Sequence, residues 1–264
     1  MNKLPISVCL VAGNEAHRIR PALESVKDWT SEIVLAIDDK VTDGTDKVAT
    51  GYGAKVISQP WRGHAAHRNF ASAHATQPWL LALDADEVVS SALRDEILAT
   101  FSQHAPAGLP AAYSFPRLSY FGGRWIRHGN WYPDRKVRLW RKEAGQWEGD
   151  PHEKLVLRGA VVRLRGNLLH FSNENIDQLL GKIGVVSSIF VRQCQTRGRH
   201  TGWTDLAIRP LWKFFRAYIL RRGFLDGWPG YFIAWMDAFS TVTRYAKVIE
   251  AEPLAAQPKS EPLV

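Results

Sequence analysis

The chain reads Trp79-Leu80-Leu81-Ala82-Leu83-Asp84-Ala85-Asp86-Glu87 within its first third, an apolar run that ends in a group of carboxylates. A short apolar run bounded by polar residues is typical of a strand that is buried on both faces. Around it, similar runs alternate with segments of helical periodicity. Strands are expected at Ile6–Val11, Ile33–Ile37 and Ala54–Ile57, and helices at His17–Trp29, Thr42–Val48, His64–Ala75 and Ser90–Ser102. This β-α alternation predicts the α/β class, with a mainly parallel sheet covered by helices on both faces.

The rest of the chain changes character twice. After a loop at Pro106–Pro110, strand-like segments follow at Ala112–Leu118, Val137–Trp140, Lys154–Leu157 and Val161–Leu164. From Ile176 onward the pattern is helical, with a break at Asp226–Gly230, and the end is rich in proline. We therefore expect a catalytic α/β domain over residues 1–172, an amphipathic helical extension over 173–250 and a disordered tail over 251–264.

Composition limits the class of protein. Of the 264 residues, 45% are hydrophobic and 23% are charged, which suits a globular chain with a full core. The longest apolar runs, Ile6–Ala12 and Trp79–Leu83, are far shorter than the roughly 20 residues of a membrane-spanning helix. The start of the chain lacks a signal-peptide cleavage site. Because Cys9 and Cys194 suggest no disulfide framework, we expect a reducing, cytoplasmic location.

Charge is distributed unevenly along the chain. Residues 1–115 carry ten basic and thirteen acidic side chains, whereas 116–165 carry twelve against five and 180–250 carry eleven against four. Basic surface attracts phosphates of nucleotides, nucleic acids or anionic membranes. The basic run Arg135, Lys136, Arg138, Arg141 and Lys142 is either a solvated face or a contact for an anionic acceptor.

Acidic residues follow two of the expected strands, where parallel sheets bind ligands. Asp84 and Asp86, one residue apart, can hold Mg²⁺ or Mn²⁺, which would bridge the phosphates of a nucleotide sugar. The alternative is that these acidic side chains only stabilise the N-terminus of a helix through its dipole. Asp84–Val88 also fits a phosphatase pattern in which Asp84 is the phosphorylated nucleophile, although three strands precede it here. In the segment Asp38–Thr45, Asp38 can bind a base or ribose, or Thr42 and Asp43 can simply begin a helix.

Taken in order, several motifs resemble family 2 glycosyltransferases of the GT-A fold, over about residues 5–250. They are Asn14-Glu15, Asp38 with Thr42–Thr45, Arg68-Asn69 and Leu83–Glu87. Three later segments look like the branch of bacterial lipopolysaccharide-core β-glucosyltransferases: Trp147–Lys154, Leu168-Leu169-His170 and Tyr218–Gly227. The resemblance implies a Rossmann-like GT-A domain and an inverting transfer from a UDP-sugar, with glucose as the first candidate.

The resemblance also implies roles for individual residues. It places Asn14, Glu15 and Asp38 around the nucleotide, Arg68 near the diphosphate, Asp84 near the ribose or metal and Asp86 on the metal. Family members often have small residues where this chain has Lys40 and Val41, which puts the shape of that loop in doubt and allows Asp39 to replace Asp38.

An inverting transferase needs a general base that deprotonates the acceptor hydroxyl. We choose Glu153, with Asp134 as substitute and Asp150 third; a solvent-exposed pairing of Glu153 with Lys154 or Arg158 is the alternative. By the same resemblance, His170 is a third metal ligand or a contact for the diphosphate, and a structural histidine is an equal alternative.

The C-terminal helices combine a basic face with many aromatic residues. Such helices can lie in a membrane interface, or they can pack on the catalytic domain or on a second copy. We expect a peripheral protein on the inner face of the bacterial inner membrane, with a lipid-linked lipopolysaccharide or lipooligosaccharide core as acceptor and no nucleic-acid partner. A non-catalytic binder of nucleic acid or anionic lipid is the competing class, but it leaves the acids after successive strands unexplained.

Overall fold

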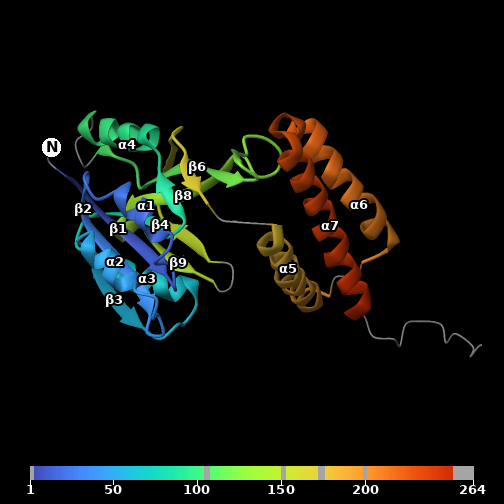
Figure 1. The fold of residues 1–264 in the computed structure, drawn as a ribbon, viewed down its shortest axis with the longest axis horizontal. Coiled ribbons are helices and arrows are strands. Elements are labelled where there is room, and N and C mark those ends of the chain that lie inside the picture. Colours follow the sequence, from blue (N-terminus) through green and yellow to red (C-terminus); the bar gives the residue numbers. More distant parts are fainter. Residues whose placement is uncertain (1–2, 104–107, 150–152, 172–175, 199–200, 252–264) are drawn as a thin grey trace, which may run out of the picture. The chain divides into compact units, whose positions relative to one another are not determined.

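The computed structural model describes residues 3–103, 108–149, 153–171, 176–198 and 201–251 (Figure 1). Two compact units divide the chain, and each is described by itself. The first unit comprises residues 1–119 and 133–172, and the second comprises 120–132 and 173–264. The second unit therefore includes a segment, residues 120–132, that precedes the expected boundary at residue 172. Except for Ala251, the expected disordered tail lies outside the described residues.

The first unit is built on one sheet with strand order β3-β2-β1-β4-β8-β6-β12-β5. Its N-terminal half contains β1 (Leu4–Ala12), β2 (Thr30–Asp38), β3 (Lys55–Gln59) and β4 (Trp79–Asp84), which pair with one another in parallel. These are the four strands expected from the apolar runs, so the predicted α/β class with its parallel sheet is confirmed.

Later strands extend this sheet, several of them antiparallel to their neighbours. They are β5 (Glu87–Val89), β6 (Ala112–Phe121), β8 (Asp134–Arg141), β11 (Val161–Arg163) and β12 (Leu168–His170). In the second unit, β7 (Arg124–Trp125) pairs antiparallel with Tyr120 and Phe121, the last two residues of β6. The strand β8 joins β4 to β6 with antiparallel pairing on both sides. A separate antiparallel hairpin consists of β9 (Gly145–Glu148) and β10 (Lys154–Leu157). The sheet thus places the basic strand β8 directly beside β4.

Both faces of the sheet are buried, as continuous apolar strands require. On β1, Val8 and Leu10 belong to one core cluster, while Cys9 between them belongs to the other, because successive side chains of a strand point to opposite faces. The first cluster includes residues of α1 (Ile19–Glu24), α2 (Thr45–Gly51) and α4 (Ser91–Gln103), and the second includes α3 (His64–His74).

Two helices differ from the sequence prediction. The helix expected over His17–Trp29 is only six residues long, and turns follow it. The helix expected from Thr42 begins at Thr45, after a left-handed Gly44 with a φ of 88°, a backbone conformation that glycine adopts most easily. Thr42 is therefore not the cap of this helix, and the loop before it is longer than periodicity indicated.

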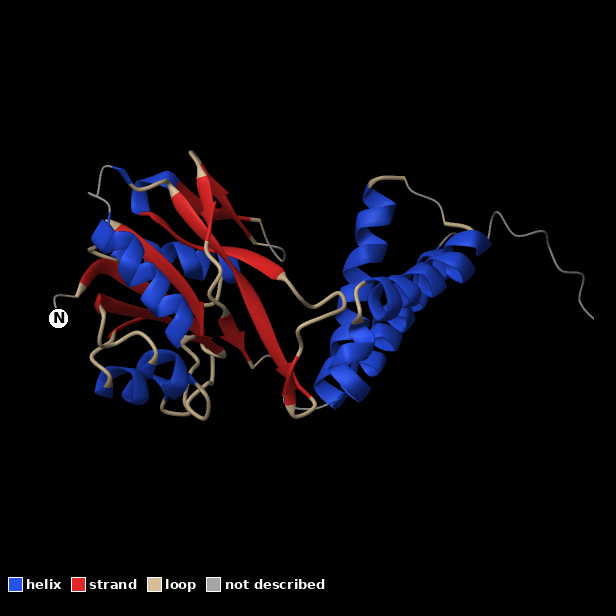
Figure 2. Ribbon diagram, turned by 90° about the horizontal axis from the view of Figure 1, so that it is seen from above, coloured by secondary structure: helices blue, strands red, loops and turns tan. Residues whose placement is uncertain are grey.

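The second unit contains the helices α5 (Ile176–Thr196), α6 (Trp203–Phe215) and α7 (Gly227–Ala251), with α7 packed against both others. Figure 2 shows these helices in blue. A π-helical turn (Arg216–Leu220) and a 3₁₀ turn (Gly223–Asp226) connect α6 to α7. A Cβ on Gly230 would lie 1.9 Å from the Gly223 carbonyl oxygen, so this close approach requires glycine. Within the described ranges, none of the helices has the length and apolar character to cross a bilayer.

Candidate active site

The candidate site begins where three parallel strands end together. In the sheet, β1 lies between β2 and β4, with Val11 opposite Asp84 and Ala12 opposite Ile37. The loops that follow these strands leave from the same edge. The expected ligand-binding acids of the N-terminal half lie at this edge: Asp38 and Asp84 are the last residues of β2 and β4, and Glu15 and Asp86 lie in the loops after β1 and β4.

Hydrogen bonds join the loop after β1 to the loop after β2. The amide of Thr42 donates to the Asn14 side-chain oxygen at 3.1 Å, and the amide of Glu15 donates to the Thr45 hydroxyl at 2.8 Å. Asp43 accepts from the Thr45 amide at 3.0 Å and from its hydroxyl, which lowers the pKa of the Asp43 carboxyl. Asn14 and Glu15 therefore help to hold the loop that follows Asp38.

Asp38 and Asp39 form a carboxyl pair at the end of β2. A hydrogen bond between the two side chains lowers the pKa of Asp38 and raises the pKa of Asp39. The Lys40 amide also donates to Asp38 at 3.3 Å. Asp38 lies at the expected edge, two strands from Asp84, and is half-buried.

Two arginines hold Asp84 from opposite sides. Its Oδ1 accepts from Arg68 on α3 at 2.6 Å, and its Oδ2 accepts from Arg138 on β8 at 2.7 Å. Burial opposes the ionisation of this carboxyl, but the guanidinium groups of Arg138 and Arg68 outweigh it and hold the pKa of Asp84 well below its usual range. Asp84 is therefore an anion whose main partners are protein cations.

Beneath Asp84 lies a buried ion cluster that the sequence analysis did not anticipate. Glu87 is fully buried, and its carboxylate accepts hydrogen bonds from Arg138 at 3.0 Å and from Arg117 at 3.4 Å. The same carboxylate accepts a third hydrogen bond from the Asp84 amide at 3.1 Å. Arg138 belongs to the basic run that a solvated face would explain, yet only 5% of it is exposed. Arg138 stands between Val137 and Leu139, but the strand around it is basic, so the sequence carried no signal that this arginine would be buried.

The structure brings His170 to Asp86. Strand β12 pairs antiparallel with β5, which follows Asp86, and places His170 opposite Glu87. The His170 Nε2 lies 3.7 Å from the Asp86 carboxylate, and Arg18 lies 3.8 Å from the same oxygen. Ser119 contacts the other ring nitrogen, Nδ1, at 3.3 Å, which orients Nε2 toward Asp86. Burial, followed by the nearby Asp84, raises the pKa of Asp86.

Asp86 and His170 suit a metal ion whose remaining ligands come from a substrate. Within the described ranges no group of three or more His, Cys, Asp and Glu side chains could hold a metal by itself. Asp86 and His170 provide one oxygen and one nitrogen ligand side by side. Divalent cations of the Mg²⁺ type commonly take one or two protein ligands together with phosphate oxygens and water. The pair therefore fits such a cation, whereas both oxygens of Asp84 are already engaged.

A cavity of about 550 Å³ opens beside Asp84 in the first unit. Its lining residues come from α3, β4, β6, β8 and the β9–β10 hairpin: Arg68, Asp84, Arg117, Arg135, Lys136, Val137, Arg138, Trp147, Glu153, Lys154 and Leu155. The cavity therefore unites three of the expected site residues, Arg68, Asp84 and Glu153.

Glu153 reaches the cavity because the β9–β10 hairpin is tied to α3. Asn69 donates to the Trp147 carbonyl at 2.8 Å and accepts from its amide at 2.9 Å. The Trp147 ring lies 4.8 Å from the Arg68 guanidinium, and Arg68 Nε lies 3.6 Å from the Glu153 carboxylate. The sequence analysis noted Asn69 beside Arg68 but did not predict this role.

The other two candidate bases are placed differently. Asp134 forms ion pairs with Arg117 at 2.7 Å and Lys136 at 3.1 Å. Although burial opposes it, these two cations lower the pKa of Asp134, which makes it a weaker base. Asp150 lies outside the described residues.

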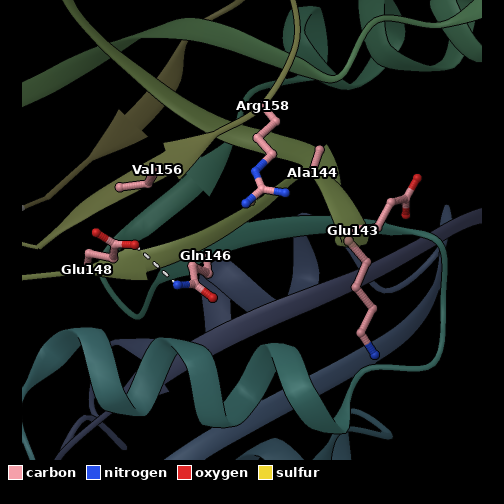
Figure 3. A pocket seen from close by; sticks show the side chains of 8 residues that line it. Glu143, Ala144, Gln146, Glu148, Val156 and Arg158 are labelled. Carbon is pink, nitrogen blue, oxygen red and sulfur yellow. Dashed lines mark hydrogen bonds between the residues drawn. The ribbon is translucent and has the colours of Figure 1, made fainter.

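A second cavity, of about 320 Å³, lies at the β9–β10 hairpin (Figure 3). Gln146 and Glu148, two positions apart on β9, point toward each other, and the Gln146 side-chain amide donates a hydrogen bond of 3.2 Å to the Glu148 carboxylate. Arg158 borders the same space. Since none of the expected site residues lines it, we assign the chemistry to the larger cavity.

The second unit exposes an unusual number of large apolar side chains. Trp203 is 81% exposed on α6, and further members, on the segments from α6 to α7, are Ile208, Leu211, Trp212, Phe215, Ile219, Leu220, Phe224, Leu225, Trp228, Tyr231, Trp235 and Phe239. We call this set the aromatic surface. Large exposed apolar areas on a protein commonly mark interaction sites.

Known proteins resemble this chain at three levels. The family model described as "Glycosyl transferase family 2" matches residues 7–159. An uncharacterized glycosyltransferase of Rickettsia typhi, RT0209, is 31% identical over 255 residues, which make up 93% of this chain and 87% of that protein. The lipopolysaccharide core biosynthesis glycosyltransferase LpsC of Rhizobium meliloti is 28% identical over 267 residues, covering 97% and 96%. The solved mannosyltransferase PcManGT of Pyrobaculum calidifontis, in complex with GDP-Man and Mn²⁺, matches in fold with a TM-score of 0.54 at 12% identity, covering 96% and 89%.

Proposed function

The chain belongs to glycosyltransferase family 2 and has its GT-A fold, and from this premise we propose that it transfers glucose from UDP-glucose to a lipid-linked lipopolysaccharide or lipooligosaccharide core, with inversion and with the help of Mg²⁺ or Mn²⁺. The observation that carries the proposal is the arrangement of Arg68 and Arg138 around Asp84, beside the Asp86–His170 pair. The printed name of the relative LpsC supports the choice of acceptor.

In this proposal the donor diphosphate lies against Arg68, Asp86 and His170. Two nitrogens of Arg68, Nε and Nη1, are buried and have no hydrogen-bond partner among the described residues. Buried donors of this kind favour an anionic ligand, because an unsatisfied charged donor costs about 1–3 kcal/mol or more. A cation held by Asp86 and His170 would neutralise charge on the departing diphosphate.

Glu153 serves as the base in the same proposal. Its carboxylate takes the proton of the acceptor hydroxyl while the hydroxyl oxygen attacks C1 of the sugar. The bond from C1 to the diphosphate oxygen breaks on the opposite face, and UDP leaves with the electron pair. The ion pair with Arg68 holds Glu153 beside the proposed donor position, which is the placement that a general base requires.

The aromatic surface supports attachment to a membrane. Basic residues Arg209, Lys213, Arg216, Arg221 and Arg222 are interspersed with its aromatic members. Aromatic rings favour the headgroup region of a bilayer, and basic groups favour anionic lipid phosphates. We therefore place the protein at the cytoplasmic face of the inner membrane, where a lipid-linked acceptor is accessible.

The phosphatase alternative fits the site less well. A phosphorylated nucleophile needs a carboxylate oxygen that can attack phosphorus, whereas both oxygens of Asp84 accept from arginines. The ion cluster of Arg138, Glu87 and Asp84 also explains the acids after β4 in a way that a non-catalytic basic binder does not.

Calorimetric titration of UDP with Mn²⁺, and then with EDTA, tests the proposal without knowledge of the acceptor. We expect UDP to bind with Mn²⁺ and to lose at least tenfold in affinity in EDTA, with GDP much weaker. Asp86→Ala should remove this dependence on metal. Asp95→Ala, which changes an exposed carboxylate of α4, is the matched control. Failure of UDP to bind in either condition would exclude it as the donor nucleotide, and stronger binding of GDP would replace UDP with GDP.

A further inference from the structure

The cavity beside Asp84 carries more cationic than anionic side chains. Six of its lining residues are arginine or lysine, and only Asp84 and Glu153 are acidic. Its volume of about 550 Å³ is in the range of sites that bind small organic ligands. An excess of positive charge in such a space favours an anionic ligand.

Four of the six cations have anionic partners in the protein, and three of these four belong to the ion cluster around Asp84 and Glu87. Arg68 pairs with Asp84, Arg138 with Asp84 and Glu87, and Arg117 with Glu87 and Asp134. These ion pairs neutralise the arginines in the buried part of the cavity, on the side where the donor is proposed to bind.

The remaining three cations, Arg135, Lys136 and Lys154, form what we call the basic rim. Lys136 contacts Asp134 at 3.1 Å, and Arg135 uses one nitrogen to donate to the Leu164 carbonyl at 2.9 Å. Among the described residues, no carboxylate pairs with Arg135 or Lys154. Arg135 and Lys154 are therefore cavity cations that no carboxylate of the described ranges neutralises, and Lys136 adds a third positive charge beside them.

The basic rim lies next to the proposed base, because Lys154 follows Glu153 directly at the start of β10. A sugar whose hydroxyl reaches Glu153 would present its neighbouring substituents to this rim. We propose that the acceptor sugar carries a carboxylate or a phosphate close to the reacting hydroxyl, and that Arg135, Lys136 and Lys154 bind this group. This inference rests on the proposed function and assigns the chemical class of its acceptor.

The experiment is a ligand-observed NMR titration of the full chain with three probes, glucose, glucuronate and glucose 6-phosphate, with and without UDP and Mn²⁺. We expect one or both anionic sugars to bind at least tenfold more tightly than glucose, and the two arms separate a carboxylate from a phosphate. Arg135→Gln and Lys154→Gln should each lower that affinity at least fivefold and leave the affinity for UDP unchanged. Arg158→Gln, an exposed arginine that borders the second cavity (Figure 3), is the matched control.

Equal binding of glucose and the anionic sugars would overturn the inference. An equal loss in Arg158→Gln would do the same, because it would reveal only general attraction by a basic surface. Binding of inorganic phosphate as tight as that of glucose 6-phosphate would show an anion site without sugar recognition. If UDP fails to bind while the anionic sugars still bind through the rim, the proposed donor is wrong and the anionic subsite stands.

Discussion

Arg138 connects the stability of the first unit to its candidate site. It is buried on β8 and donates to both Asp84 and Glu87, and all three side chains depend on one another for their charge balance. Removing one partner of a buried ion cluster is far more damaging than removing an exposed pair, because the remaining charges lose solvation and partner together.

We expect Arg138→Met to destabilise the protein by about 3–5 kcal/mol, measured as the free energy of unfolding in urea. Arg94→Met removes an arginine from the exposed pair with Asp95 and should change stability by less than about 0.5 kcal/mol. Similar losses in the two variants would contradict the view that the Asp84–Glu87 cluster needs Arg138.

In the proposed mechanism, Glu153 takes part in the chemistry and not in donor binding. We expect Glu153→Gln to bind UDP as tightly as the parent protein and to lower the transfer rate by about 100-fold or more, since the amide cannot take a proton. Transfer from labelled UDP-glucose to lipooligosaccharide measures the rate. Asp134→Asn should keep most of the activity. Unchanged turnover in Glu153→Gln would eliminate it as the base.

At the scale of elements, the site depends on a contact between α3 and β9. Asn69 makes two hydrogen bonds with the backbone of Trp147, and the hairpin that begins there delivers Glu153 to Arg68. Sheet pairing explains the other half of the site, because β12 beside β5 brings His170 to Asp86. In each half of the site, one contact between segments that are distant in the sequence positions the side chains.

We expect Asn69→Ala to weaken the hairpin attachment by about 1–3 kcal/mol, as for two hydrogen bonds. Amide hydrogen exchange in β9 and β10 should become faster, and transfer should fall while UDP affinity changes little. Ser72→Ala on the same helix is the control, since its hydroxyl donates to the helix carbonyl of Arg68. Unchanged exchange in the hairpin of Asn69→Ala would show that other contacts hold it.

At the scale of the whole molecule, the chain combines a first unit that contains the candidate site with a second unit that exposes the aromatic surface. The same part of the chain is positively charged, because residues 180–250 contain eleven basic and four acidic side chains. A binding partner that is both apolar and anionic satisfies both features, and a bilayer with anionic lipids has these properties.

Sedimentation with lipid vesicles tests this surface. We expect binding to phosphatidylglycerol vesicles that weakens with salt, and little binding to phosphatidylcholine. Trp203→Ser together with Trp212→Ser should reduce binding about tenfold or more, because each ring adds buried apolar area. Val162→Ser, an exposed apolar residue of the first unit, should have no effect. If the protein instead forms a stable dimer that the two tryptophan substitutions dissociate, the partner of the aromatic surface is a second copy of the chain.

The sequence alone determined the features that depend on neighbours in the chain. Apolar runs predicted β1 to β4, and the acids that follow β2 and β4 predicted the edge at which the site lies, because strands in a parallel sheet end together. Local periodicity was less successful where a loop conformation decides the outcome, as at Gly44, which delays α2 to Thr45.

Only the tertiary structure decided which side chains meet. Arg138 reaches Asp84 across 54 positions, and Asn69 holds Trp147 across 78. No local pattern distinguishes these residues from solvated polar ones, because the free energy that selects them comes from burial and from partners on other strands and helices. For the same reason, the charge of the basic run Arg135–Lys142 could be assigned to an ion cluster and a cavity rim only after the sheet had placed β8 beside β4.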